Sequence, residues 1–281
     1  MAPHTPKQLY YSCNIPLATN GPMYLGKRRP DGLLVEKEMG VDGVEHPKPR
    51  EADWLKAVIW KSIAVIGIDV SPHHYNPEES VENLYLNVDN LNMPLQFHSS
   101  HFDLINSRLI AGGIDRNRWH GYMRDMLRCL RGGGWCQMAE IDFNAQSDNG
   151  TLTDGHALRQ WSEKYRQAMS RFKNPEAPRR LGHWMRNAGF TDVEERMIPL
   201  PMCGWSDNQR EFDIGIANQE NVRLLLGSLA LYPFTELLGM TITEFHVLVA
   251  QARAEATNPA LKVKKTALDY SFAPRSIHNG L

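Results

Sequence analysis

Short runs of consecutive apolar residues alternate along the chain with longer stretches whose apolar residues recur at helical spacing. The clearest run, residues 63–69, is rich in β-branched side chains and ends in Asp69, which is typical of a strand covered on both faces. The same patterns predict strands at residues 84–89, 101–107 and 135–141, helices at residues 51–63 and 116–130, and a glycine turn at residues 132–134. Because helix and strand alternate, the sequence predicts an α/β, doubly wound parallel sheet, whose ligands bind beyond the carboxyl ends of the strands.

The second half of the chain is mostly helical. Apolar periodicity predicts helices at residues 155–172, 179–188, 221–238 and 243–256, with one or two strands within residues 190–200. These helices exceed what a sheet needs for cover, so we expect a helical cap within residues 143–180 and 205–265. Residues 1–50, rich in proline, glycine and charge, are expected to form an N-terminal arm, and residues 51–281 a single domain.

The composition narrows the classes of partner. The chain has 281 residues, of which 42% are hydrophobic and 22% charged, the ordinary range for a globular protein with one sizeable core. The formal net charge is -1, and the basic residues are scattered, so the chain lacks the basic stripe that nucleic acids and anionic membranes require. We therefore expect a small-molecule substrate and neither a nucleic acid nor a membrane as partner. Among oligomers, the sequence is compatible with a homodimer.

Neither metal binding nor secretion is indicated. The four cysteines lack the close pairs that build zinc sites or redox motifs, so we expect free thiols and no metal. The N-terminus has no apolar stretch after its charges, and the most apolar window, residues 224–234, is too short to span a bilayer. The sequence therefore predicts a cytoplasmic protein.

Five segments together resemble successive motifs of a known family. They are VIGIDVSP at residues 65–72, FDLINSR at 102–108, RCLRGGGW at 128–135, AGFTDV at 188–193 and LPMCGW at 200–205. In order and spacing they are similar to the fungal LaeA-like class I S-adenosylmethionine-dependent methyltransferases, over roughly residues 60–270. The resemblance implies the Rossmann-like sheet of that class and an enzyme of fungal secondary metabolism.

The resemblance also implies residues for the adenosine part of the cofactor. Asp69 matches the carboxylate that accepts hydrogen bonds from the ribose hydroxyls, and such an acceptor at a strand end suits a vicinal diol. Asp89 matches the position whose side chain approaches the adenine amino group, with Asn90 beside it. The alternative is that both aspartates are surface turn residues.

The sequence departs from the family where a strand and three alternating glycines should precede these positions. The corresponding stretch, residues 40–49, has one glycine after Asp42, then a glutamate, a histidine and two prolines. The family's glycines let the backbone turn tightly and approach the methionine part of the cofactor, which side chains and prolines obstruct.

Three functions remain open on this evidence. We expect a cyclase or pericyclase that requires no cofactor and acts on a small apolar substrate of the polyketide or terpenoid kind. The first alternative is an S-adenosylmethionine-dependent methyltransferase on such a substrate, with the loop rebuilt by the arm before residue 40. The second is a non-catalytic regulatory protein that keeps the fold to bind a partner.

Candidate catalytic groups follow the predicted strands. Arg108 could stabilise charge on a substrate oxygen, Glu140 could act as a base, and His120 could move a proton at neutral pH. Trp205 and Tyr122 would supply an apolar wall for the substrate. The structural alternatives are a salt bridge between Arg108 and Glu140, a surface histidine, and aromatic side chains that belong to the core.

Overall fold

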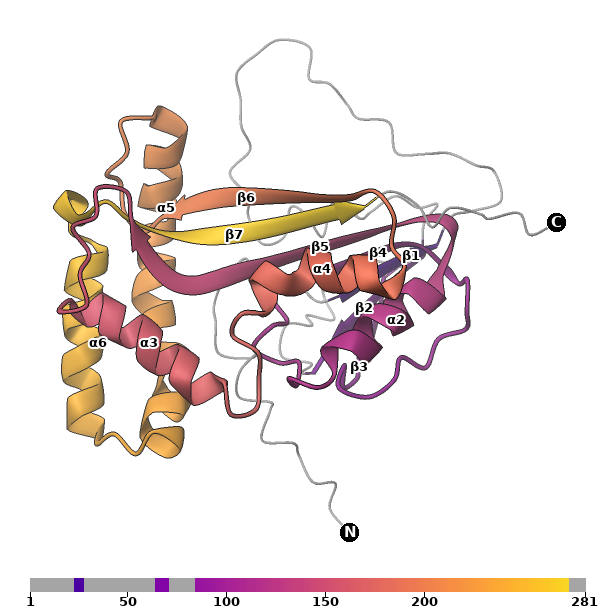
Figure 1. Cartoon of the computed structure of the whole chain (residues 1–281), viewed down its shortest axis with the longest axis horizontal. Helices are drawn as coiled ribbons and strands as arrows, with labels where there is room; N and C mark the ends of the chain where they lie inside the picture. Colours follow the sequence, from indigo (N-terminus) through magenta and orange to yellow (C-terminus); the bar gives the residue numbers. More distant parts are fainter. Residues whose placement is uncertain (1–22, 28–63, 71–83, 273–281) are drawn as a thin grey trace.

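A seven-stranded sheet organises the molecule. The computed structural model describes residues 23–27, 64–70 and 84–272 (Figure 1). In spatial order the strands are β3 (Leu84–Val88), β2 (Ala64–Asp69), β1 (Met23–Lys27), β4 (Phe102–Arg108), β5 (Leu130–Ser147), β7 (Val263–Phe272) and β6 (Val193–Pro201). The α/β, Rossmann-like fold expected from the sequence is confirmed.

The sheet is mixed, with antiparallel strands beside the parallel pairs that the alternation of helix and strand predicted. β2 runs parallel to β3, and β4 runs parallel to β5. β1 is antiparallel to both of its neighbours, and β7 is antiparallel to β5 and β6. Because Met23 pairs with Ile68, it is the beginning of β1 that lies beside the carboxyl end of β2.

β5 is much longer than predicted, with 18 residues. The three glycines expected to form a turn lie inside this strand, in a bulge. On β4, Phe102 pairs with Leu130, whereas Leu104 two residues later pairs with Trp135. Gly133 takes up the extra length with a φ of +81°, a conformation that glycine adopts without strain.

Two amphipathic helices pack against the sheet and each other. α2 (Trp119–Cys129) buries apolar side chains at helical spacing, and α4 (Ala177–Ala188) ends at Gly189 in the left-handed conformation. The rings of Trp119 and Trp184 stack with centroids 5.3 Å apart. These contacts form a core that continues into β4 and β5.

A second core lies within what we call the helix cluster: α3 (Ala157–Met169), α5 (Gln209–Ser228), the π-helix η4 (Pro233–Leu237) and α6 (Ile242–Ala256). β4 ends where Arg108 pairs with Ala139, and β5 continues past that point toward the cluster (Figure 1). A short 3₁₀ helix, η5 (Pro259–Leu261), precedes β7. A role of these helices as a substrate cap stays a prediction.

Helix boundaries differ from the predictions mainly in one place. α5 begins at Gln209 and ends at Ser228, so the helix predicted at residues 221–238 is two elements. The first half of α5 is mostly exposed and carries no apolar stripe that periodicity could detect. The helix predicted at residues 51–63, and the N-terminal arm apart from β1, lie outside the described residues.

Candidate functional site

The structure brings Asp69, Asp89 and Asn90 together at one edge of the sheet. Asp69 ends β2 and pairs with Val88 of the parallel strand β3, so both aspartates lie at adjacent carboxyl ends. The backbone N–H of Asp89 donates to the Asp69 carbonyl (3.0 Å), and an Asp89 carboxylate oxygen accepts from the Asn90 N–H (2.7 Å). Both aspartates are half-buried. Two carboxylates at this edge fit the hydroxyl and amino groups of an adenosine.

The methionine part of such a cofactor would lie farther along the same edge. The degenerate stretch at residues 40–49 is outside the described residues. Because β1 begins rather than ends at this edge, the described part of the chain places no glycine-rich turn after β1 there. The fit of the described residues is therefore to the adenosine part.

Glu140 of β5 lies in the core, one residue beyond Ala139, which pairs with the last residue of β4. Its side chain is 2% exposed, and its two carboxylate oxygens accept hydrogen bonds from the N–H groups of Ile110 (2.8 Å) and Ala111 (3.2 Å). Burial raises the pKa of Glu140 to about 8, although the two N–H groups oppose that rise. Arg108 donates from Nε to the Asn106 side-chain oxygen (3.2 Å) on its own strand. Glu140 thus holds the loop that follows β4, and a further role as a base stays a prediction.

Two of the predicted site residues belong to α2. Tyr122 was expected to form a substrate wall, but it is fully buried in the core, where its hydroxyl donates to Ser107 Oγ (3.1 Å). That burial raises its pKa well above the usual range. Its core position depends on packing against β4 and β5, which the local sequence does not reveal. His120 is exposed, with its ring edge-on to Trp184 of α4 at 5.8 Å.

Trp205 lies between β6 and α5. Its indole N–H donates to the Val263 carbonyl at the start of β7 (2.8 Å), and the Lys262 amine lies 6.0 Å from the ring centroid. The side chain is half-buried. These contacts fasten the chain after β6 to β7, and a role in substrate binding stays a prediction.

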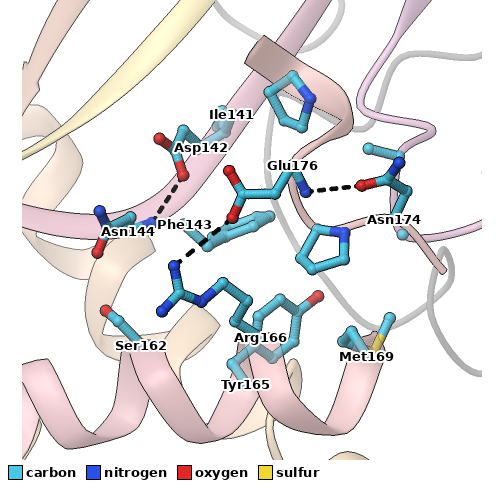
Figure 2. A pocket seen from close by; sticks show the side chains of 14 residues that line it. Ile141, Asp142, Phe143, Asn144, Ser162, Tyr165, Arg166, Met169, Asn174 and Glu176 are labelled. Atoms are coloured by element: carbon cyan, nitrogen blue, oxygen red, sulfur yellow. Dashed lines mark hydrogen bonds and ion pairs between the residues drawn. The ribbon is translucent and has the colours of Figure 1, made fainter. Parts of the chain in front are cut away.

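A pocket that the sequence did not predict opens between β5, α3 and the beginning of α4 (Figure 2). The rings of Phe143 and Tyr165 meet edge to face at 5.5 Å along one wall. The residues that line the pocket are Ala111, Gly112, Ile141, Asp142, Phe143, Asn144, Ser162, Tyr165, Arg166, Met169, Asn174, Pro175, Glu176 and Pro178. Most of the contact surface is apolar, as is usual for small-molecule sites.

The charges around this pocket compensate one another. Arg179 is paired with the Asp142 carboxylate at 2.6 Å, and Arg166 with Glu176 at 3.6 Å. Figure 2 shows the second pair reaching from α3 to the residue that precedes α4. The pocket therefore suits a ligand without a large net charge.

Lys265 of β7 lies behind the aromatic wall. It is 4% exposed, and its amine lies 5.0 Å from the centroid of Phe143 and 5.7 Å from that of Trp161. Within the described part of the chain this amine has no hydrogen-bond partner. Desolvation lowers its pKa to about 7, against the opposing effect of the Asp142 charge.

Two fungal laeA proteins are similar in sequence to part of the chain. No protein-family model matches the chain. A secondary metabolism regulator laeA from Monascus pilosus is 30% identical over 200 residues, which cover 69% of this chain and 52% of the relative. The protein-methionine methyltransferase laeA from Emericella nidulans is 27% identical over 198 residues, covering 69% of this chain and 51% of that protein. The chain thus spans about half the length of the curated relatives that it matches.

Two solved structures that align with most of the described chain have low sequence identity to it. A phosphoethanolamine N-methyltransferase from Haemonchus contortus, in complex with S-adenosylhomocysteine, is 16% identical with a TM-score of 0.43, covering 74% of this chain and 43% of that one. The [4+2]-cyclase SpnF is 12% identical with a TM-score of 0.40, covering 74% of this chain and 66% of that one.

These findings correct one expectation and leave others open. The expectation that no cofactor is required is wrong, because the Emericella nidulans relative is named a methyltransferase, an activity that needs a methyl donor. Cyclisation is not confirmed. None of the helices in the described ranges could span a membrane. The cellular compartment stays a prediction.

Proposed function

The chain belongs to the LaeA-like methyltransferase family, and from this premise we propose that it is an S-adenosylmethionine-dependent methyltransferase of fungal secondary metabolism. The observation that carries the proposal is the placement of Asp69 and Asp89 at adjacent carboxyl ends of two parallel strands. A pair of acceptors held by a rigid sheet edge supports binding of an adenosine.

Each described residue at this edge has a separate task. The Asp69 carboxylate would accept hydrogen bonds from both ribose hydroxyls, and Asp89 with Asn90 would lie against the adenine amino group. When bound, S-adenosylmethionine supplies an electrophilic methyl group. The protein's own contribution is to fix the positions of the two reactants and to exclude water.

The acceptor would occupy the pocket beside α3. Ala111 and Gly112 of the loop after β4, and Phe143 of β5, bring the pocket to the carboxyl side of the sheet. Its volume is about 40 Å³, so it would take only the reacting end of a polyketide or terpenoid, and its apolar lining and compensated charges favour a weakly polar group there. Glu140 holds the loop through Ile110 and Ala111, so it would orient that wall of the pocket.

Isothermal titration with S-adenosylmethionine and S-adenosylhomocysteine tests the cofactor assignment. We expect micromolar binding to the wild type and a loss of about 10- to 100-fold in Asp69→Ala, since hydrogen bonds to a charged group are removed. Asp213→Ala is the matched control, because it removes an exposed carboxylate on α5. Absence of binding at millimolar cofactor would reject the proposal.

A second candidate acceptor is a protein methionine, the substrate in the name of the Emericella nidulans relative. Both oxygens of Glu140 are engaged by backbone N–H groups, and a thioether acceptor has no proton for a base to remove. Glu140→Gln separates the candidates in assays with labelled cofactor: transfer to a hydroxyl should slow if Glu140 is the base, and transfer to a methionine should not. Cofactor binding without any methyl transfer would favour a regulatory role.

A further inference from the structure

A buried lysine joins the loop after β4 to the end of α3. Lys173 is 4% exposed, and its amine donates to the Gly113 carbonyl (2.6 Å) and to the Asp115 carboxylate (2.8 Å). The backbones also meet here, because Asp115 and Lys173 form an antiparallel bridge and the Arg116 N–H donates to the Phe172 carbonyl (2.9 Å). The joint therefore connects two segments far apart in the sequence through both side-chain and backbone contacts.

The same two loop residues are held from the other side by Asn92. Its side-chain nitrogen donates to the Gly113 carbonyl (3.0 Å), and its side-chain oxygen accepts from the Asp115 N–H (2.7 Å). The Asn92 N–H donates in turn to the side-chain oxygen of Asn90 (3.0 Å). Asn90 lies beside Asp89 at the edge assigned to adenosine, so a continuous set of hydrogen bonds runs from that edge to α3.

This set of hydrogen bonds also positions the walls of the pocket. The residues that line the pocket include Ala111 and Gly112, immediately before Gly113, and Met169 and Asn174, which precede and follow Lys173 in the sequence. The Lys173 N–H donates to the Met169 carbonyl (2.8 Å). A displacement of Lys173 would therefore move these lining residues relative to one another.

We propose that Lys173 is a positioning residue. Through Asn92 and the Gly113–Asp115 loop, it fixes the position of the acceptor pocket relative to the sheet edge that carries Asp69 and Asp89. The inference rests on the proposed function, because it needs a ligand at Asp69 and Asp89. Binding that orders Asn90 also orders the groups bonded to it, and the chain of contacts extends that order to the end of α3. An ammonium with 4% exposure has little access to water as a replacement partner, which ties Lys173 to these two oxygens.

Hydrogen–deuterium exchange of the full chain with and without S-adenosylhomocysteine tests the inference. In the wild type we expect the nucleoside to slow exchange about fivefold or more at residues 109–116 and also at residues 169–174. In Lys173→Met the slowing should persist in the loop and disappear at residues 169–174. Arg171→Met, which removes an exposed cation from the same segment, should behave as the wild type.

The outcomes separate the two proposals. Binding of S-adenosylhomocysteine without slower exchange at residues 169–174, or with slowing that survives in Lys173→Met, overturns the role of Lys173 and leaves the methyltransferase proposal intact. Failure of the nucleoside to bind the wild type overturns both. If Lys173→Met does not fold, Asn92→Ala replaces it, with retained binding and loss of slowing in both segments as the expected result.

Discussion

Lys173 and Lys265 are equally buried, at 4% exposure each, yet their surroundings are opposite. The Lys173 amine contacts two oxygen atoms at the joint between the sheet and the helix cluster. The Lys265 amine faces two aromatic rings at the base of that cluster and lacks a hydrogen-bond partner within the described residues. The buried Lys173 therefore joins two segments of the structure, whereas the buried Lys265 has an amine whose charged form is costly.

The electrostatics follow from those contacts. Desolvation lowers the pKa of both lysines, but Asp115 opposes the shift at Lys173 through a hydrogen bond as well as its charge. At Lys265 only the charge of Asp142 opposes it, and the pKa falls to about 7. Asp142 is itself bound to Arg179. A direct oxygen partner stabilises the charged form of a buried amine more strongly than the faces of aromatic rings do.

The largest effect is expected from removing Trp161, one of the two aromatic rings beside Lys265. Trp161 is fully buried, stacks on Tyr165 at 5.2 Å and donates from its indole N–H to the Leu226 carbonyl (2.9 Å). Trp161→Ala should lower the free energy of unfolding by about 3–5 kcal/mol, measured by urea denaturation. Trp135→Ala, at a side chain 49% exposed, should lower it by less than about 1 kcal/mol. Equal losses of stability in the two variants would show that the helix cluster does not depend on the Trp161 side chain.

Substitution of each lysine by methionine should change stability in opposite directions. At pH 6, Lys265→Met removes a buried ammonium without a hydrogen bond and should raise the free energy of unfolding by about 1–3 kcal/mol. Lys173→Met removes the hydrogen bonds from the ammonium to the Gly113 carbonyl and the Asp115 carboxylate, and should lower it by about 1–3 kcal/mol. Urea denaturation of both variants measures the difference, and the comparison fails if the two changes have the same sign.

The pH dependence of Lys265 sharpens this comparison. Its pKa is about 7 in the folded protein against an ordinary 10.5, so between these values the unfolded chain binds more protons. Stability from this group therefore rises with pH across that window, by up to about 1.4 kcal/mol per pH unit. The advantage of Lys265→Met should shrink between pH 7 and 10. An advantage that stays constant would contradict a neutral amine.

Part of the fold could be predicted because its patterns are local. The β-branched run of β2 and the apolar stripes of α2 and α4 each specify their own element, whatever packs against them. β7 was missed because Lys264 and Lys265 stand side by side in it and obscure the alternation of a strand. The direction of β1 was not predictable, since the two neighbours that fix it come later in the chain.

The candidate site, like the fold, could be predicted from the sequence only in part. Asp69 and Asp89 could be placed together from the sequence, because the ends of parallel strands meet at one edge. The core position of Tyr122 and the wall formed by Phe143 could not, because both depend on how separate elements pack. Nothing in the sequence distinguishes Lys173 from Lys265, because the difference lies in the groups that folding brings to each amine. These are oxygens of Gly113 and Asp115 at Lys173, and two aromatic rings at Lys265.

Glu140 is a buried acid that can be compared with the buried amine of Lys265. Its pKa is about 8 in the folded protein against an ordinary 4.5, so the unfolded chain releases its proton first and stability from this group falls as pH rises between those values. Glu140→Gln removes that fall and keeps one acceptor for the Ile110 and Ala111 N–H groups. Its free energy of unfolding should therefore gain on the wild type by up to about 1.4 kcal/mol per pH unit from pH 5 to 8, opposite in direction to the Lys265 effect. Urea denaturation at a series of pH values measures the trend, with Glu163→Gln on the exposed face of α3 as control. Parallel curves for wild type and Glu140→Gln would mean that the two N–H groups outweigh burial and keep Glu140 ionised.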